Sequence, residues 1–362
     1  MTVVDTKVGQ QVLLKGTDAV GTAAILAGCT HYFGYPITPQ NEIGEFLARE
    51  LPKAGGVFLQ SESEVSAINM VFGAAICGKR AMTSTSGPGY SLMLEGISNV
   101  AGTDTPCVLV LVSRIGPGGG NIEPSQGDYT SVTQGGAHGG YHTIVLAPSS
   151  IQELFDQVQL GFDLADKYRI MVIILTEGTL AQMMEPVEVK RVSIGEQLPP
   201  KDWALTGKLG RGHQNIVASV WLAPGAANAY HEQLQQKYRA IAENEVRCER
   251  YLMEDAEVAV AAFGGIARLA WAAVDAARAE GIKAGLIRPI SLWPFPHAVI
   301  TQTMAQVRSL LVVEANMGQM LHDVLYATPL ERRRDVHLLG RPDCNISPLE
   351  ILDLIRQLAQ GG

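Results

Sequence analysis

Short apolar segments alternate with amphipathic helical segments from residue 17 to about residue 185, and this alternation constrains the fold more than any other feature. The apolar segments have the length of strands and are almost continuously hydrophobic, as expected when both faces of a sheet are buried. The segments between them repeat apolar side chains at helical spacing, as at Val65, Ile68, Phe72 and Ile76. Strands that alternate with helices form a parallel sheet with helices on both faces, so the sequence predicts an α/β fold.

The first unit is expected to contain helices over 18–27, 65–77, about 90–101 and 150–167, and strands over 57–60, 81–84, 107–113 and 170–175. A second, smaller α/β unit is expected, with strands over 258–263, 283–288 and 309–314 and helices over 267–280 and 296–305. Prolines and glycines interrupt the pattern between the two units, where residues 229–254 are expected to form a polar helix. We therefore expect a first domain over 1–190, a linker with an exposed helix over 191–255 and a second domain over 256–362.

Composition limits the classes of function. Only 18% of the 362 residues are charged while 47% are hydrophobic, which argues against disorder and favours large protein interfaces. The net charge is −8 and no basic run is present, so nucleic acid is not an expected partner. The longest apolar runs have only the length of strands, and the N-terminus lacks a basic start followed by an apolar core. We expect no membrane segment and a cytoplasmic location.

Cysteine and histidine spacing does not indicate a metal or redox centre on this chain. The five cysteines are widely separated and never form a CxxC pair, so neither an iron–sulfur site nor a zinc site is expected. His138 and His142 lie in a glycine-rich stretch and are expected to be loop residues, with a metal site as the lesser alternative. Any redox centre is expected on another chain.

Four polar segments follow predicted strands, at the sheet edge where ligands bind in parallel α/β folds. They are residues 34–39, 60–64, 85–89, and 113–114 followed by the glycine-rich 116–120. The glycine turns could present backbone N–H groups to an anion, or they could be ordinary turns. Neither turn matches a P-loop or a GxGxxG pattern.

Three side chains in these segments have both a structural and a chemical interpretation. Thr38 lies between two prolines in a rigid turn, where its hydroxyl could contact a ligand or only form an ST-turn. Glu64 follows Ser61 by three residues, which is the spacing of a helix capping box. Arg114 ends a strongly apolar strand, where its guanidinium could bind a carboxylate or form an interface ion pair.

Several motifs, in this order, resemble the alpha subunit of the 2-oxoacid:ferredoxin oxidoreductases. The resemblance covers the chain from Gly16 to about Glu350, and among family members it is greatest to the separate alpha chains of the 3-methyl-2-oxobutanoate and 2-oxoglutarate enzymes. The motifs are Tyr35-Pro36-Ile37-Thr38-Pro39, Glu62-Ser63-Glu64, Thr85-Ser86-Gly87-Pro88-Gly89, Val112-Ser113-Arg114, the run from Arg288 to Pro296, and the run from Glu314 to Gln319. One departure is Gly16-Thr17-Asp18-Ala19 in place of the frequent Gly-Asn-Glu-Ala, which puts no catalytic role in doubt.

The resemblance implies a thiamine diphosphate enzyme in which the first domain binds the aminopyrimidine and the second resembles the transketolase C-terminal domain. This sequence has no GDG motif followed by an asparagine, the pattern that holds magnesium and diphosphate. A beta subunit is therefore expected to hold the diphosphate and Mg²⁺. A gamma subunit and a ferredoxin-like delta subunit are further expected partners, and the iron–sulfur clusters would lie on partner subunits only. Ferredoxin or another acceptor would take the electrons, and coenzyme A would be the co-substrate.

The resemblance also implies roles for particular residues. Glu64 matches the glutamate that bonds N1′ of the aminopyrimidine and so favours the tautomer that removes the C2 proton, with Glu62 as the nearby alternative. Such a carboxyl is expected in apolar surroundings with a raised pKa. Thr38 and Arg114 match residues that bind the substrate carboxylate and carbonyl. The remaining cofactor-binding residues are expected to be Pro36, Ile37, Ser86 and Gly87.

The sequence therefore predicts the alpha subunit of a coenzyme A-acylating 2-oxoacid oxidoreductase that forms acyl-CoA and CO₂ from 3-methyl-2-oxobutanoate or 2-oxoglutarate. Three alternatives remain open. The chain could be a non-catalytic subunit of such a complex, a subunit acting on aryl 2-oxoacids or pyruvate, or half of a transketolase-like or decarboxylase enzyme that passes no electrons.

Overall fold

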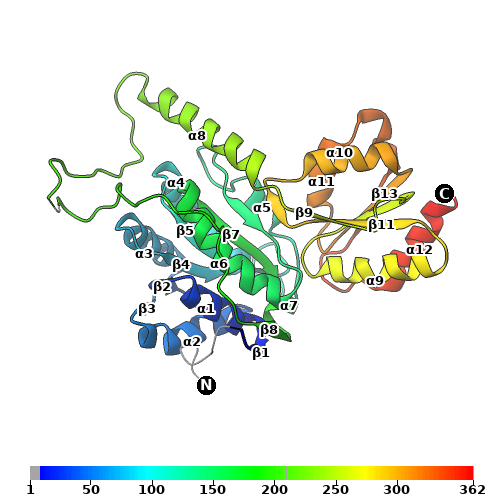
Figure 1. The fold of residues 1–362 in the computed structure, drawn as a ribbon, viewed down its shortest axis with the longest axis horizontal. Coiled ribbons are helices and arrows are strands. Elements are labelled where there is room, and N and C mark those ends of the chain that lie inside the picture. Colours follow the sequence, from blue (N-terminus) through cyan, green and yellow to red (C-terminus); the bar gives the residue numbers. More distant parts are fainter. Residues whose placement is uncertain (1–8, 209, 362) are drawn as a thin grey trace.

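The computed structural model describes residues 9–208 and 210–361, which form two α/β units joined by an extended linker and a long helix (Figure 1). The predicted α/β class is confirmed, because each unit is built on a mainly parallel sheet. A separate antiparallel pair forms from β1 (Gln11–Lys15) and β8 (Met184–Glu188).

The first unit contains a seven-stranded sheet. Its strands lie in the order β12 (Ser291–Trp293), β6 (Ile144–Leu146), β7 (Met171–Glu177), β5 (Cys107–Ser113), β4 (Ala81–Thr85), β2 (His31–Gly34) and β3 (Val57–Gln60). All are parallel except β12, which runs antiparallel to β6. Along the chain, β12 comes after the first strands of the second sheet, but it pairs with β6 in the first sheet. Backbone hydrogen bonding at this edge therefore links the two units.

Helices cover both faces of the first sheet because its strands are apolar on both sides. On β5, Leu109 and Leu111 pack with α3 (Glu64–Ile76) and α4 (Gly87–Gly102), while the alternate side chains pack with helices on the other face. Those opposite helices are α1 (Gly16–Leu26), α2 (Asn41–Glu50) and α6 (Ile151–Tyr168). Shorter helices of this unit are the 3₁₀ turn Pro52–Ala54, α5 (Tyr129–Thr133) and α7 (Gly178–Gln182).

The second unit contains a five-stranded sheet in the order β14 (Val336–Gly340), β13 (Ser309–Glu314), β10 (Val258–Ala261), β11 (Ala284–Pro289) and β9 (Cys248–Tyr251). Only β9 is antiparallel to its neighbour. Its helices are α9 (Ile266–Ala279), α10 (His297–Gln306), α11 (Gln319–Ala327), α12 (Pro348–Ala359) and the 3₁₀ turn Leu330–Asp335. Helices α9 and α12 cover one face, and α10 and α11 cover the other.

The linker differs from the prediction at its C-terminal end. Helix α8 spans Ala226–Asn244. Within the remainder of the expected helix over 229–254, β9 forms instead, an edge strand paired with β11. This part of the prediction is wrong because the backbone of β9 finds its hydrogen-bond partners on a strand that lies more than thirty residues later. Figure 1 shows the preceding linker as a long loop beside the first unit, before α8 leads to the second.

Polar and apolar contacts join the two units. One buried hydrophobic cluster continues from the first sheet into the second, and includes Leu111, Phe263 and Met320. Arg288 on β11 is buried and donates to Glu153 on α6 at 2.7 and 2.9 Å, as well as to Glu249. The units are therefore packed against each other by both types of contact.

Candidate active site

The carboxyl ends of β2 and β4 form the point at which the strand order of the first sheet changes direction. From β2 the chain goes to β3 on one side, and then to β4 on the other. Connections diverge at such a point and leave a crevice, which is where ligands bind in open parallel sheets. The predicted segments 34–39 and 85–89 follow these two strands, so the fold brings them to one place.

Glu64 is buried beside this crevice, with only 4% of its surface exposed. It is the first residue of α3, and the N-cap is Ser63, whose hydroxyl accepts the backbone N–H of Ser66. The capping box between Ser61 and Glu64 is therefore not formed. Within the described residues, no hydrogen bond or ion pair involves the carboxyl group of Glu64, so this buried polar group has no partner of its own chain.

Gly89, in the first turn of α4, explains how the Glu64 carboxylate fits. A β-carbon on Gly89 would lie 2.5 Å from Oε1 of Glu64 and would also collide with the hydroxyl of Thr85. Glycine is therefore required for α3 and α4 to approach closely. The close approach places the carboxylate against the start of α4, at the end of β4.

Glu62, the alternative to Glu64, has a different environment. It is exposed, and its carboxylate accepts the hydroxyl of Ser66, a bond that lowers the pKa of Glu62. The Glu62 carboxylate is solvated and already accepts a hydrogen bond from Ser66, so its hydrogen bonding is satisfied without a ligand. The geometry therefore favours Glu64 for a role in the crevice.

Ser86 and Gly87 lie where β4 ends and α4 begins. Ser86 is fully buried, and its hydroxyl has no hydrogen-bond partner among the described residues. Gly87 is the first residue of α4, and a β-carbon there would lie 2.7 Å from a carboxylate oxygen of Asp128. The Ser86 hydroxyl is thus a second buried polar group at this crevice without a partner.

Thr38 and Arg114 are 76 residues apart in the chain and meet at the same edge of the sheet. Arg114 follows β5 and donates to the backbone carbonyl of Thr38 at 2.9 Å and to that of Gly119 at 3.4 Å. Its Nε is buried without a partner, and within the described part of the chain it forms no ion pair. Pro36 and Thr38 are exposed, and Ile37 is half-buried.

Two cavities flank the contact between Arg114 and Thr38. One of about 710 Å³ is lined by Arg114, the start of α4 and residues of the second unit. The other, of about 530 Å³, is lined by Thr38 and by residues of α2 and α7. Both volumes are in the range of small-molecule sites.

Two residues that hold the site together were not predicted. Asp128 accepts the hydroxyl of Ser113 at 2.7 Å, and burial raises the pKa of its carboxyl. Gln40 donates to the carbonyl of Tyr35 at 3.0 Å and accepts the hydroxyl of Ser84, so it ties the loop after β2 to β4. Gln40 lies next to a predicted segment, whereas no local pattern distinguishes Asp128.

The second sheet has its own point of reversal, at the carboxyl ends of β10 and β13, and Gln126 fills it. The side chain of Gln126 donates to the carbonyl of Phe263 at 2.9 Å and accepts the N–H of Ala315 at 3.0 Å. Its backbone N–H also donates to the carbonyl of Ala315. The crevice of the second sheet is therefore occupied by a residue of the first unit.

Buried carboxylates beside this second crevice do have partners. Glu177, at the end of β7, accepts the N–H of Gly265 at the start of α9, and burial raises its pKa to about 7. Glu314 accepts the N–H groups of Met320 and Leu321 at the start of α11, and burial raises its pKa to about 7 as well. Helix N-termini stabilise such anions.

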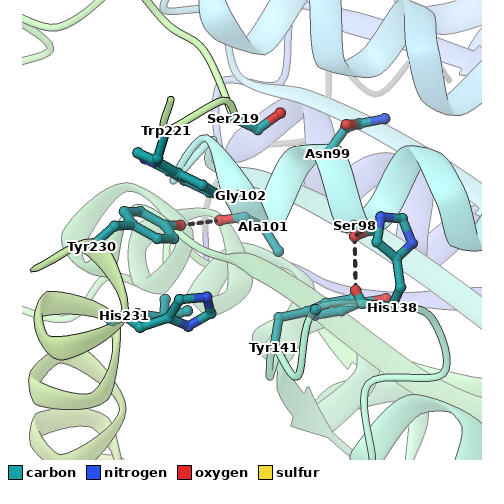
Figure 2. A pocket seen from close by; sticks show the side chains of 12 residues that line it. Ser98, Asn99, Ala101, Gly102, His138, Tyr141, Ser219, Trp221, Tyr230 and His231 are labelled. Carbon is teal, nitrogen blue, oxygen red and sulfur yellow. Dashed lines mark hydrogen bonds between the residues drawn. The ribbon is translucent and has the colours of Figure 1, made fainter. Parts of the chain in front are cut away.

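A further cavity, of about 230 Å³, lies near the C-terminal end of α4 (Figure 2). Trp221 stacks on Tyr230 with ring centroids 4.1 Å apart, Tyr230 donates to the carbonyl of Ala101, and Ser98 donates to that of His138. At 1.5 Å per helical residue, this end of α4 is about 20 Å from Gly89. The cavity is therefore separate from the crevice that contains Glu64.

The described residues contain no group of three or more His, Cys, Asp or Glu side chains placed to hold a metal ion. None of their helices combines the length and the apolar character needed to cross a bilayer.

Comparisons with known proteins match most of the chain. A family model described as pyruvate flavodoxin/ferredoxin oxidoreductase, thiamine diP-bdg, matches residues 22–246, and one described as pyruvate:ferredoxin oxidoreductase core domain II matches residues 256–349. Ketoisovalerate oxidoreductase subunit VorB of Methanothermobacter thermautotrophicus is 46% identical, over 96% of this chain and 97% of the relative. The 2-oxoglutarate synthase subunit KorA of the same organism is 34% identical, over 96% of this chain and 99% of the relative.

A similar solved structure is that of 2-oxoglutarate:ferredoxin oxidoreductase from Magnetococcus marinus, with 2-oxoglutarate, coenzyme A and succinyl-CoA bound. The TM-score is 0.86 at 27% sequence identity, and the match covers 97% of this chain. This chain spans 65% of the length of that protein's matched chain.

Proposed function

Because the chain belongs to the 2-oxoacid:ferredoxin oxidoreductase family, we propose that it is the alpha subunit of a multi-subunit enzyme that decarboxylates a 2-oxoacid oxidatively and forms an acyl-CoA. The observation that carries the proposal is the buried carboxylate of Glu64, which has no partner within the described residues and lies at the switch point of the first sheet. Relatives named as 2-oxoacid oxidoreductase subunits match nearly the whole chain, which supports the same conclusion.

The residues at the crevice fit the aminopyrimidine half of thiamine diphosphate. Glu64 and the Ser86 hydroxyl are buried polar groups without partners in the described chain, and the lack of a β-carbon at Gly89 lets the Glu64 carboxylate lie against the start of α4. Glu64, Ser86 and Gly87 would hold the polar side of the ring, and Pro36 and Ile37 would contact its apolar part. When bound, thiamine diphosphate supplies the nucleophilic carbon and the electron sink that decarboxylation of a 2-oxoacid requires.

Glu64 would act by holding a proton at N1′ of the aminopyrimidine. A carboxyl shares a proton best when it is shielded from water, and Glu64 is almost completely buried. Glu62 is exposed and already accepts a hydrogen bond from Ser66, so it cannot replace Glu64 without rearrangement of the loop.

Arg114 would bind the substrate carboxylate. Its bonds to the carbonyls of Thr38 and Gly119 fix the guanidinium at the wall of the cavity of about 710 Å³, so little conformational freedom is lost when an anion binds. The exposed hydroxyl of Thr38 would contact the same carboxylate or the keto oxygen. Together the two residues would orient the keto carbon toward the crevice.

Partner subunits would complete the site. The surface around the crevice carries exposed apolar side chains on the edge strand β3 and on α3 and α4, namely Val57, Leu59, Val65 and Leu92. We place a beta subunit, with the diphosphate and Mg²⁺, over this surface. Gamma and ferredoxin-like delta subunits would join the complex, iron–sulfur clusters on the partner subunits would receive the electrons, and coenzyme A would accept the acyl group.

The test is anaerobic purification of this chain with the subunits that accompany it, followed by reduction of methyl viologen. A panel of 2-oxoacids is assayed with and without coenzyme A and thiamine diphosphate. Reduction that requires both compounds is the expected result. A complex that contains thiamine diphosphate and intact clusters but reduces no viologen with any 2-oxoacid contradicts the proposal and favours a non-redox or non-catalytic role.

A further inference from the structure

The cavity of about 710 Å³ beside Arg114 is built from both units of the chain. The first unit contributes the start of α4 and the loop that follows β5, and the second contributes Met317 and Pro342. A substrate held by Arg114 through its carboxylate would extend its side chain into this space. The lining of the cavity therefore bears on which 2-oxoacid fits.

Charge in the lining is sparse and of opposite signs. Among the described residues that line the cavity, Arg114 is the only cation and Asp128 the only anion. The Asp128 carboxylate is fixed, because it accepts the hydroxyl of Ser113 at 2.7 Å and lies directly against Gly87. Burial raises the pKa of Asp128, which indicates that water is partly excluded around it.

The rest of the described lining is uncharged and mixed in polarity. Ile115 and Pro117, on the loop after Arg114, and Met317, in the second unit, are among its apolar side chains. Its polar side chains are Ser91, Ser125, Ser131, Asn316 and Gln319. Met317 is 73% exposed, which is unusual for a large apolar side chain that borders a cavity. An apolar substrate group would cover this exposed surface.

We propose, on the basis of the function proposed above, that this cavity selects 2-oxoacids with an uncharged side chain, with Met317 and Asp128 as the specificity-determining residues. A single cation can bind only the carboxylate next to the keto group. A dicarboxylic 2-oxoacid would bring a second carboxylate among uncharged side chains and toward Asp128, where no described cation of this chain compensates it. A dicarboxylic 2-oxoacid is disfavoured for two reasons: no second described cation attracts its second carboxylate, and Asp128 repels it.

Two variants of the whole complex test this selection, each assayed with 3-methyl-2-oxobutanoate and 2-oxoglutarate. Met317→Arg supplies a cation at the cavity wall and is expected to raise the ratio of kcat/KM for 2-oxoglutarate over 3-methyl-2-oxobutanoate by about tenfold. Asp128→Asn keeps an acceptor for Ser113 and removes the charge, and is expected to raise the same ratio by about fivefold. The change is expected mainly in KM.

Met184→Arg is the matched control, because Met184 is 56% exposed on β8 and lies outside both cavities beside Arg114. Its ratio is expected to equal that of the wild type. A wild-type complex that prefers 2-oxoglutarate, or an unchanged ratio in both Met317→Arg and Asp128→Asn, overturns the selection while leaving the proposed function intact. Absence of activity with every 2-oxoacid in the wild-type complex overturns the proposed function itself, and this selection with it.

Discussion

The two sheets of this chain each have a switch point in their strand order, yet only one of these points is filled by a side chain from the other unit. At the first, between β2 and β4, Glu64 and Ser86 are buried without partners among the described residues. At the second, between β10 and β13, the side chain of Gln126 bonds both strand ends. The same architecture thus leaves buried polar groups without partners in one unit and forms an attachment point between units in the other.

The carboxylates beside the two crevices show the same contrast. Glu177 and Glu314 accept backbone N–H groups at the starts of α9 and α11, so their hydrogen-bonding needs are met within the chain. Glu64 also lies at a helix start, but within the described residues it accepts no hydrogen bond. A buried carboxylate whose needs are unmet is a sign of function, whereas one whose needs are met is a sign of structure.

The largest expected effect concerns the open crevice. Arg114→Ala is expected to lower kcat/KM for the preferred 2-oxoacid by about 100-fold to 1,000-fold, because a fixed charge-assisted contact to the substrate carboxylate is lost. Steady-state viologen reduction measures the change. Arg334→Ala is the control, since the side chain of Arg334 is 87% exposed on the second unit. Equal activity in the two variants would remove Arg114 from the site.

At the crevice of the second sheet, which Gln126 fills, the expected effect is a loss of stability. Gln126→Ala leaves the carbonyl of Phe263 and the N–H of Ala315 without these side-chain partners, and is expected to lower the free energy of unfolding by about 4 kcal/mol. Chemical denaturation measures this loss, with Gln134→Ala at an exposed position as control. A loss no larger than that of the control would mean that Gln126 does not hold the units together.

Titration at the filled crevice gives a smaller, pH-dependent effect. The pKa of Glu177 is raised from 4.5 to about 7 in the folded chain, so the folded state binds a proton more tightly than the unfolded state. The stabilising contribution of the protonated form is therefore complete below pH 4.5 and is lost as the pH rises toward 7, by about 3 kcal/mol. Glu177→Gln is expected to flatten this part of the stability profile in denaturation at pH 5 and pH 7.5. If Glu177→Gln left the pH dependence of the free energy of unfolding unchanged, Glu177 would not be the group with the raised pKa.

The smallest effect is expected at Ser86. Without cofactor, Ser86→Ala is expected to leave the melting temperature unchanged or slightly raised, because the hydroxyl has no partner in the described chain. The affinity of the complex for thiamine diphosphate is expected to fall by about fivefold, because one neutral hydrogen bond to the cofactor is lost. Thermal denaturation measures the melting temperature without cofactor, and titration calorimetry measures the affinity for thiamine diphosphate. A marked loss of stability without cofactor would show that the hydroxyl serves the fold.

Local pattern predicted β3 and β5 with the bounds that the structure shows, whereas β2 was not among the expected strands. The polar segments after β2 and β4 do meet at one edge of the sheet. It failed where the outcome depends on distant partners. Gln126 bonds Ala315, 189 residues away, and β9 became a strand because β11 lies beside it. The capping box was wrong for a local reason: Ser63, with extended backbone, precedes α3 directly and takes the position expected for Ser61.

The central claim is that Glu64, and not Glu62, holds the proton at the cofactor. The most direct measurement compares Glu64→Gln with Glu62→Gln in the purified complex, by kcat for viologen reduction at saturating thiamine diphosphate. Glu64→Gln is expected to lower kcat by at least about 100-fold, the usual size of a general acid–base contribution, while Glu62→Gln keeps nearly full activity. Wild-type turnover in Glu64→Gln, or an equal loss in both variants, would contradict the account.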